Sequence, residues 1–219
     1  MDNNFQNNLF AEKRFQLIQE LKTKGIKDKR VLNALNNLPR ELFVEEPFIN
    51  RAYEDNALPI KCNQTISQPY TVAYMTELLD VQQGNKILEI GTGSGFQAAL
   101  LHLLGAEVYT IERFEELAIN AMKKFQNLGF NIKVYTGDGT KGLPEFAPYD
   151  RIIVTAAAPQ EPKSLIKQLK IGGKLVIPIG DKRYQIMHLI IRLNENNYRD
   201  IEKGEFRFVP LIGDEGWKE

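Results

Sequence analysis

The chain has 219 residues, which suits one α/β domain with additions and is enough to bury a sizeable core. Lys and Arg together number 28 and Asp and Glu also number 28, so the formal net charge is zero, which argues against nucleic-acid binding driven by overall charge. A single cysteine, Cys62, excludes an intrachain disulfide, and the chain shows neither a signal peptide nor an apolar run near the ~18 residues of a membrane span, so we expect a cytoplasmic protein without a membrane partner.

Residues 9–81 predict a helical addition that precedes the core of the fold. Residues 1–8 are rich in asparagine and are expected to be a frayed tail. Residues 9–24 have amphipathic helical spacing, and Asp28 is placed to cap a second helix that ends at Pro39. The segment after it has no steady period. We expect this addition to cover the mouth of a site and to shape an acceptor pocket.

A third helix is predicted from Gln68 onward, with Pro69 near its start and Ser67 at its N-cap. A serine in this setting has two possible roles. It can simply cap the helix, as most such serines do, or its hydroxyl can join the helix N–H groups in facing an anionic group of a substrate. The residues alone leave both roles open.

The stretch KILEIGTGSGF, which starts at Lys86, predicts the centre of the fold. An apolar strand, glycines at alternate positions and a helix form the opening unit of a nucleotide-binding α/β domain. The turn reads E-x-G-x-G-x-G, whereas a dinucleotide site reads G-x-G-x-x-G. Glu89 would repel a phosphate, so S-adenosylmethionine, with its cationic sulfonium and ammonium, fits better than NAD. The candidate cofactor-binding residues of this turn are Glu89, Gly91, Thr92, Gly93, Ser94 and Gly95.

Acidic residues stand at the ends of the next two predicted strands. Residues 107–111 end in Glu112, where an acid hydrogen-bonds the ribose hydroxyls that NAD and S-adenosylmethionine share. Residues 131–135 lead to Asp138, which either accepts from an adenine amino group or forms an ordinary turn. Asp138 is the third such feature at a strand end, after the glycine turn and Glu112. It is therefore interpreted as a ligand residue, with the backbone at Gly139 against the adenine ring.

The C-terminal part predicts four more strands. They are expected at 151–159, 174–180, 184–193 and 205–211, with a helix at 162–169 after the first of them. The first closes on the small residues Ala156 to Ala158, which leave room for a ligand at the carboxyl ends of the strands. The last two are expected to pair antiparallel through the polar stretch 194–204.

From about Ile26 to Gly213 the chain resembles the protein L-isoaspartyl (D-aspartate) O-methyltransferases. The glycine motif alone would indicate only a methyltransferase, whereas QTISQPY joined to DRIIVTAAAP is much more specific. The other carrying segments are VLNALNNLPRELFV, VYTIER, LKIGGKLVIPIG and FRFVPL. One departure is the loop before QTIS, which usually contains glycine in the bacterial members of the family and here reads Lys61-Cys62-Asn63. This difference bears on loop flexibility and acceptor preference.

The resemblance implies a single Rossmann-like S-adenosylmethionine-dependent methyltransferase domain over residues 1–219. Its core, residues 82–219, is expected to hold a mostly parallel seven-stranded sheet, with the N-terminal helices as an addition. The implied reaction methylates the free α-carboxylate of L-isoaspartyl, and also D-aspartyl, residues in damaged proteins and peptides. Ser67 corresponds to the active-site serine. The implied cofactor positions are Glu89, Gly91, Gly93, Glu112 and Asp138, and the expected substrate-binding residues are Ile66, Ser67, Gln68, Thr155 and Ala156.

The implied chemistry needs no general base and no metal. A carboxylate with a pKa of ~3.5 is already ionised at pH 7. The two histidines, His102 and His188, belong to no triad and to no metal-ligand pattern. In-line positioning and exclusion of water would then carry catalysis.

Four rival functions remain for comparison. A methyltransferase acting on nucleic-acid adenine would carry an Asn/Asp-Pro-Pro-aromatic tetrad where this chain has Thr155-Ala156-Ala157-Ala158-Pro159. A small-molecule methyltransferase would share the cofactor, and a NAD-dependent oxidoreductase is disfavoured by the glycine spacing. A non-catalytic binding protein on the same fold would leave the joint presence of Ser67 and Asp138 unexplained. We therefore expect isoaspartyl proteins and peptides as partners, no nucleic acid, and a monomer.

Overall fold

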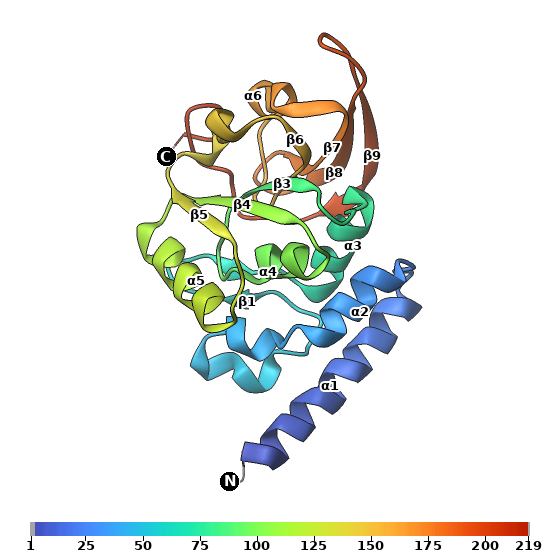
Figure 1. Ribbon diagram of the computed structural model, residues 1–219, viewed down its shortest axis with the longest axis vertical. Coiled ribbons are helices and arrows are strands. Elements are labelled where there is room, and N and C mark those ends of the chain that lie inside the picture. Colours follow the sequence, from blue (N-terminus) through green and yellow to red (C-terminus); the bar gives the residue numbers. More distant parts are fainter. Residues whose placement is uncertain (1–2, 219) are drawn as a thin grey trace.

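The computed structural model describes residues 3–218, which form a seven-stranded sheet with helices on both faces (Figure 1). The strand order is β5-β4-β3-β6-β7-β8-β9. The pairs from β5 to β7 are parallel, and β7–β8 and β8–β9 are antiparallel, which confirms the expected mostly parallel sheet. The bounds are β3 Lys86–Ile90, β4 Glu107–Glu112, β5 Lys133–Thr136, β6 Tyr149–Val154, β7 Leu169–Gly180, β8 Gln185–Arg192 and β9 Tyr198–Phe206.

Each face of the sheet has its own apolar core. In β3, Ile87 packs with the N-terminal helices, α4 and α5, whereas Leu88 and Ile90 pack on the opposite face with α6. Successive side chains of a strand point to opposite faces, so a central parallel strand carries apolar residues on both faces, and in β3 the buried Glu89 is the exception. The helices beside the sheet are α3 Pro69–Leu79, α4 Phe96–Leu103, α5 Glu115–Asn127 and α6 Lys163–Lys167. None of the helices in the described part is both long and apolar enough to cross a membrane.

The N-terminal addition is helical, as expected, but it starts earlier than predicted. The first helix begins at Asn3 and not at residue 9 as predicted. Residues 1 and 2 lie outside the described part, and fraying of this end stays a prediction. No proline or glycine interrupts residues 3–8, and a helix gains one hydrogen bond for each residue added to an existing turn. The elements of the addition are α1 Asn3–Thr23, α2 Lys29–Asn37, 3-10 helices at Arg40–Phe43 and Glu46–Arg51, and a hairpin of β1 Leu58–Pro59 with β2 Thr65–Ile66.

The last strand lies elsewhere than the sequence predicted. It was expected at 205–211, but β9 covers Tyr198–Phe206 and uses most of the polar stretch that was assigned to a connection. Several of its side chains are exposed because β9 is the edge strand of the sheet. Charged side chains are common on edge strands, where they discourage pairing with other chains. The predicted antiparallel pairing with β8 is confirmed.

Candidate active site

A tight glycine turn follows β3 and sets the floor of the site. Gly91 has φ +92°, and a Cβ there would lie 2.5 Å from the Thr155 Oγ1. The Thr155 hydroxyl donates to the Gly91 carbonyl at 2.7 Å. Gly95 has φ +90°, and a Cβ there would lie 2.9 Å from the Phe125 ring. Glycine is required at both positions because L side chains rarely adopt this backbone and no space remains for one.

Three hollows meet around this turn. A groove of about 870 Å³ runs between α3 and the end of β9, and an outer hollow of about 70 Å³ lies over the strand tips. An inner hollow of about 40 Å³ lies between the glycine turn and the start of α3. Thr65 and Thr155 line all three, so the hollows are contiguous. The turn residues Gly91 and Gly93 line both small hollows, Thr92 and Ser94 the inner one, and Gly139 and Ala156 the outer one.

Glu112 lies where the sequence predicted it, at the wall of the outer hollow. Its Oε2 accepts from the Gly93 amide at 2.8 Å and its Oε1 from the Phe114 amide at 3.1 Å. The side chain is therefore fixed by the glycine turn and by the residue before α5. Each carboxylate oxygen can accept a further hydrogen bond, so Glu112 remains able to hold a pair of ligand hydroxyls.

Glu89 lies behind the glycine turn and lines none of the three hollows. The side chain is fully buried, and its Oε2 accepts from the Thr110 hydroxyl, which also contacts the Thr92 hydroxyl at 2.6 Å. Among the described residues its Oε1 has no hydrogen-bond partner. Burial, with a smaller effect of the nearby Glu112, raises the pKa of Glu89 to about 8. The predicted direct contact between Glu89 and a ligand stays a prediction, because the structure places this acid one layer deeper.

Asp138 makes contacts that the sequence did not predict. Its Oδ1 accepts from the Thr140 amide at 2.9 Å, as in an ordinary capped turn, and its Oδ2 accepts from the Asp214 amide at 2.8 Å. Asp138 thus anchors the C-terminal segment, in which Trp217 donates to the Ala157 carbonyl at 3.1 Å. Leu211 and Ile212 of this segment wall the outer hollow. The proposed role of Asp138 toward an adenine amino group remains a prediction, and Gly139 beside it does line the hollow.

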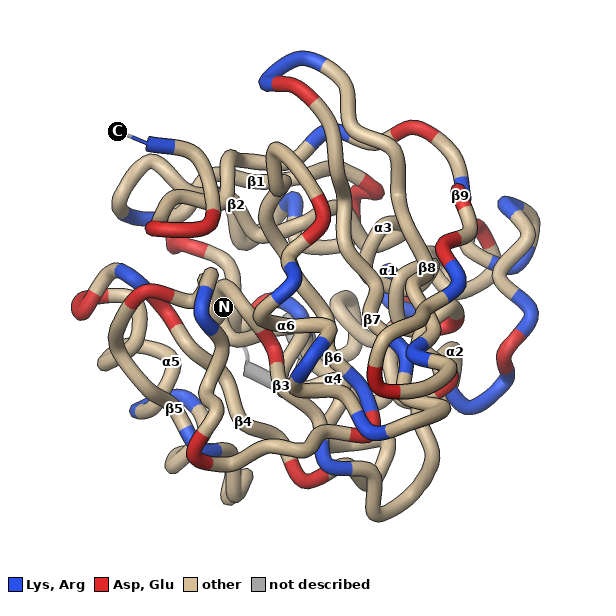
Figure 2. Tube along the Cα trace, turned by 90° about the horizontal axis from the view of Figure 1, so that it is seen from above, with Lys and Arg blue, Asp and Glu red and all other residues tan. Residues whose placement is uncertain are grey.

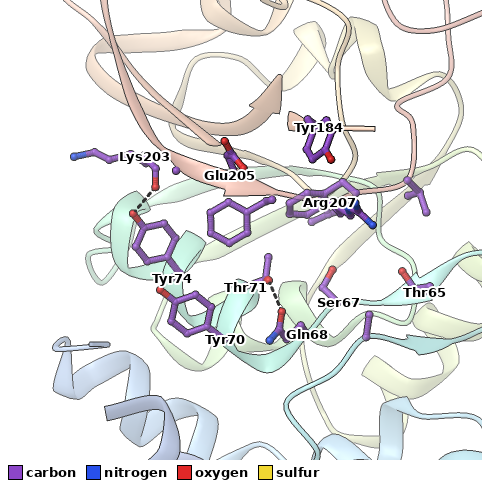
Figure 3. A pocket seen from close by; sticks show the side chains of 16 residues that line it. Thr65, Ser67, Gln68, Tyr70, Thr71, Tyr74, Tyr184, Lys203, Glu205 and Arg207 are labelled. Carbon is purple, nitrogen blue, oxygen red and sulfur yellow. Dashed lines mark hydrogen bonds between the residues drawn. The ribbon is translucent and has the colours of Figure 1, made fainter. Parts of the chain in front are cut away.

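Ser67 does not cap α3, so the predicted N-cap is wrong by one residue. The N-cap is Gln68, which makes no capping hydrogen bond of its own, because the Tyr70 amide is bound by Asp55 from another segment. In the described part of the chain the Ser67 hydroxyl has no hydrogen-bond partner, and it points into the groove (Figure 3). Ser67 also lines the inner hollow, next to Ile66, at the junction with the glycine turn. The structure therefore leaves this hydroxyl free for a ligand.

Other residues of the groove were missed by the sequence analysis. A row of stacked aromatic rings lines one side, with centroid separations of 5.8 Å between Tyr70 and Tyr74 and 5.6 Å between Tyr74 and Phe206. The Tyr74 hydroxyl donates to the Lys203 carbonyl at 2.9 Å and so ties α3 to β9 (Figure 3). Arg207 lies over the Tyr184 ring, 5.6 Å from its centroid. The alternating aromatic residues Phe206 and Phe208 were a usable signal, but the sequence analysis assigned both to the interior of a strand at 205–211, whereas β9 ends at Phe206.

The hairpin loop that departs from the glycine pattern is fastened to α5. Cys62 and Asn63 adopt left-handed backbone conformations, with φ of 58° and 55°. The Lys61 Nζ pairs with the Glu116 carboxylate at 2.6 Å. Gln64, which follows the loop, lines the outer hollow. The hairpin therefore covers the site from the N-terminal side, as expected for the addition.

The site offers no general base of the histidine type. His188 pairs with Asp200 at 2.8 Å in the antiparallel part of the sheet, and His102 packs on Phe130; neither lines the groove or the two small hollows. Among residues 3–218 no three His, Cys, Asp or Glu side chains are grouped so that they could hold a metal ion.

Comparisons with known proteins identify relatives of this chain in sequence and in fold. The family model of the protein-L-isoaspartate(D-aspartate) O-methyltransferases matches residues 12–216. The protein-L-isoaspartate O-methyltransferase of Christiangramia forsetii is 53% identical over 92% of this chain and 95% of its own, and that of Flavobacterium johnsoniae is 55% identical over 92% and 94%. A solved protein-L-isoaspartate O-methyltransferase aligns with a TM-score of 0.85 and 31% identity, covering 93% of this chain and 67% of its own. A Plasmodium falciparum structure described as such an enzyme, in complex with S-adenosyl-L-homocysteine, shares the fold with a TM-score of 0.80 and 24% identity over 91% and 98%.

Proposed function

Because this chain belongs to the protein-L-isoaspartate(D-aspartate) O-methyltransferase family, we propose that Ser67 holds the acceptor carboxylate during methyl transfer. The enzyme uses S-adenosylmethionine to methylate the free α-carboxylate of L-isoaspartyl residues in damaged proteins and peptides, which initiates their repair. The observation that carries the assignment is the unpartnered Ser67 hydroxyl at the junction of the groove and the inner hollow.

The residues around the glycine turn suit S-adenosylmethionine. The buried Glu89 has one carboxylate oxygen without a partner, and Glu112 stands at the wall of the outer hollow, so the site carries acidic groups on two layers. The Glu112 carboxylate favours a cation and opposes a phosphate-bearing nucleotide, and a bound cation would also favour the ionised form of Glu89. Glu112 would hold the ribose hydroxyls, Gly91 and Gly93 would allow close approach of the backbone, and Gly139 would face the base. When bound, the cofactor supplies an electrophilic methyl group on a sulfonium.

The acceptor side is formed by the groove. Ser67 would donate its hydroxyl proton in a hydrogen bond to one oxygen of the acceptor carboxylate and leave the other oxygen oriented toward the glycine turn. Gln68 donates to Asp55 at 3.1 Å and Thr155 donates to the Gly91 carbonyl, so these two shape the passage more than they offer free groups. Lys203 and Arg207 give the groove two positive charges against the one negative charge of Glu205, a balance that suits an anionic substrate. The flanking peptide residues would lie along the aromatic row.

The covering hairpin would exclude water from this passage. The outer and inner hollows measure about 70 and 40 Å³, whereas small-molecule sites commonly measure ~300–1,000 Å³. Gln64 and Thr65 of the hairpin line the outer hollow and would therefore move when the cofactor enters. Closure afterwards would hold the two reactants in attack geometry, which can lower a barrier by ~7–11 kcal/mol.

A matched pair of peptides tests the proposed function. We expect the purified protein to transfer label from S-adenosylmethionine to a peptide containing L-isoaspartate and not to the same sequence containing L-aspartate. Label transfer to nucleic acid or to a small molecule, with neither peptide labelled, would contradict the assignment. A D-aspartyl version of the peptide would show whether that second acceptor class is used.

We also propose that the whole chain folds as a single domain and acts as a cytoplasmic monomer on proteins. Side chains from α1, α2 and α3 belong to the same core as those from α4 and α5, which supports one folding unit. Basic and acidic residues are interspersed over the trace, which supports a protein partner over nucleic acid (Figure 2). Light scattering would give the oligomeric state.

A further inference from the structure

Asp55 is a buried acid next to the acceptor site that the proposed methyl transfer does not use. It lies in the irregular segment before β1, and its side chain is only 2% exposed. Its Oδ1 accepts from the Tyr70 amide at 2.7 Å, and its Oδ2 accepts from the Gln68 side-chain amide at 3.1 Å and from the Lys24 ammonium. Asp55 lines none of the three hollows, so it does not touch a ligand there.

The carboxylate of Asp55 acts as a helix cap supplied from a distant segment. The first N–H groups of a helix have no partner within the helix and need one. In α3 the Tyr70 amide is bound by Asp55, since the N-cap residue Gln68 makes no capping bond. A carboxylate is favourable at this end of the helix dipole. Asp55 thus takes the capping role that the sequence offered as one possibility for Ser67.

Asp55 is in turn held directly by Lys24 and indirectly by Arg40. Lys24, which follows α1, pairs with its Oδ2. Arg40 is 1% exposed and donates from Nε to the Ala52 carbonyl at 2.8 Å, which fixes the segment that carries Asp55. The Arg40 guanidinium lies 5.1 Å from the centroid of the Phe96 ring, at the start of α4 directly after the glycine turn. Arg40 therefore links the start of α4, beside the glycine turn, to the segment that carries Asp55, and Asp55 links that segment to the first turn of α3.

We propose that Asp55 is a positioning residue, which fixes the first turn of α3 and so holds the Ser67 hydroxyl in the direction of the acceptor carboxylate. The inference rests on the proposed function of Ser67. Asp55 binds the two residues that flank Pro69, namely Tyr70 through its amide and Gln68 through its side chain. Loss of these bonds would let the start of α3 rotate and turn the hydroxyl away, without changing a group that contacts the cofactor.

A double-mutant cycle tests this route of action. Asp55→Ala should lower kcat/KM for an isoaspartyl peptide by at least ~10-fold in the wild-type background, and by less than ~2-fold in a Ser67→Ala background. Cofactor affinity should stay within about 2-fold in both, because the cofactor is held at the strand tips. Equal losses in both backgrounds, or a matching loss of cofactor affinity, would overturn the proposal. A fully active Ser67→Ala enzyme would instead overturn the proposed function of Ser67, and the two failures are distinguishable.

A milder variant covers the case in which Asp55→Ala does not fold. Lys24→Ala removes one partner of Asp55 from a side chain that is 41% exposed. We expect a drop of about 2- to 5-fold in kcat/KM that again disappears in the Ser67→Ala background. The matched control is Lys170→Ala, which breaks an ion pair with Asp150 at 2.8 Å in a distant part of the fold and should leave kinetics unchanged. If Lys24→Ala and Lys170→Ala behave alike, Asp55 does not position Ser67.

Discussion

Glu89 should make the stability of the free enzyme depend on pH in an unusual direction. Burial raises its pKa from 4.5 to about 8, so between these values the folded chain holds a proton that the unfolded chain has released. Stability from this group is therefore complete below pH ~4.5 and is lost as pH rises through about 8. One pKa unit corresponds to ~1.4 kcal/mol, and integration from pH 6 to pH 8 gives a loss of about 2 kcal/mol.

The Glu89→Gln variant isolates this contribution. Glutamine keeps the shape of the protonated acid but does not titrate, and all other titrating groups are common to both proteins. We expect the free energy of unfolding, measured by urea denaturation, to favour the variant over wild type by about 2 kcal/mol more at pH 8 than at pH 6. A difference that is the same at both pH values would show that Glu89 is already ionised when buried, and would refute the reasoning.

Glu89 should also release a proton when the cofactor binds. A cationic ligand bound against the glycine turn would favour the ionised form of Glu89, so binding at pH 7 should release up to one proton. Calorimetry of cofactor binding in two buffers with different ionisation enthalpies measures this number. The Glu89→Gln variant is the control and should release none through this group.

Three further predictions concern individual contacts of the site. Ser67→Ala should lower kcat/KM for an isoaspartyl peptide by at least ~10-fold, yet leave the free energy of unfolding within ~0.5 kcal/mol, since the hydroxyl makes no bond in the folded chain; a destabilised but fully active variant would contradict this. Glu112→Ala should weaken S-adenosylmethionine binding by about 1–3 kcal/mol in calorimetry, and unchanged affinity would remove Glu112 from the cofactor site. Arg207→Gln should raise the peptide KM about 2- to 5-fold, while the control Arg199→Gln, at an exposed position on β9 that does not line the groove, should not.

The sequence predicted best where the signals are local. The strand, glycine turn and helix from Lys86 to Gly105 were located almost residue by residue, because the apolar run, the positive-φ glycines and the helix stop follow one another along the chain. The position of Glu112 followed in the same way, since parallel strands bring their carboxyl ends to one edge of the sheet. The fold class is confirmed on this basis.

Contacts between distant segments could not be predicted. Whether Ser67 caps its helix depends on Asp55, which lies in an earlier segment without a regular pattern, and on Lys24 at the end of α1. Asp138 resembles a ligand residue locally, but its second oxygen is taken by the Asp214 amide, 76 positions along the chain. The polar residues of β9 form a strand because β8 offers them an edge, and that edge is not visible in their own sequence.

The C-terminal segment that Asp138 anchors also gives the protein an optical reporter. Trp217 is the single tryptophan of the chain, and it bridges to Ile212, which walls the outer hollow. Its indole donates to the Ala157 carbonyl, and the Lys182 ammonium lies 5.5 Å from the ring centroid. Indole emission is sensitive to nearby charge and to hydrogen bonding, and here it comes from one known position without background from a second tryptophan. Fluorescence of the unmodified protein can therefore follow movement of the segment that walls the outer hollow in real time.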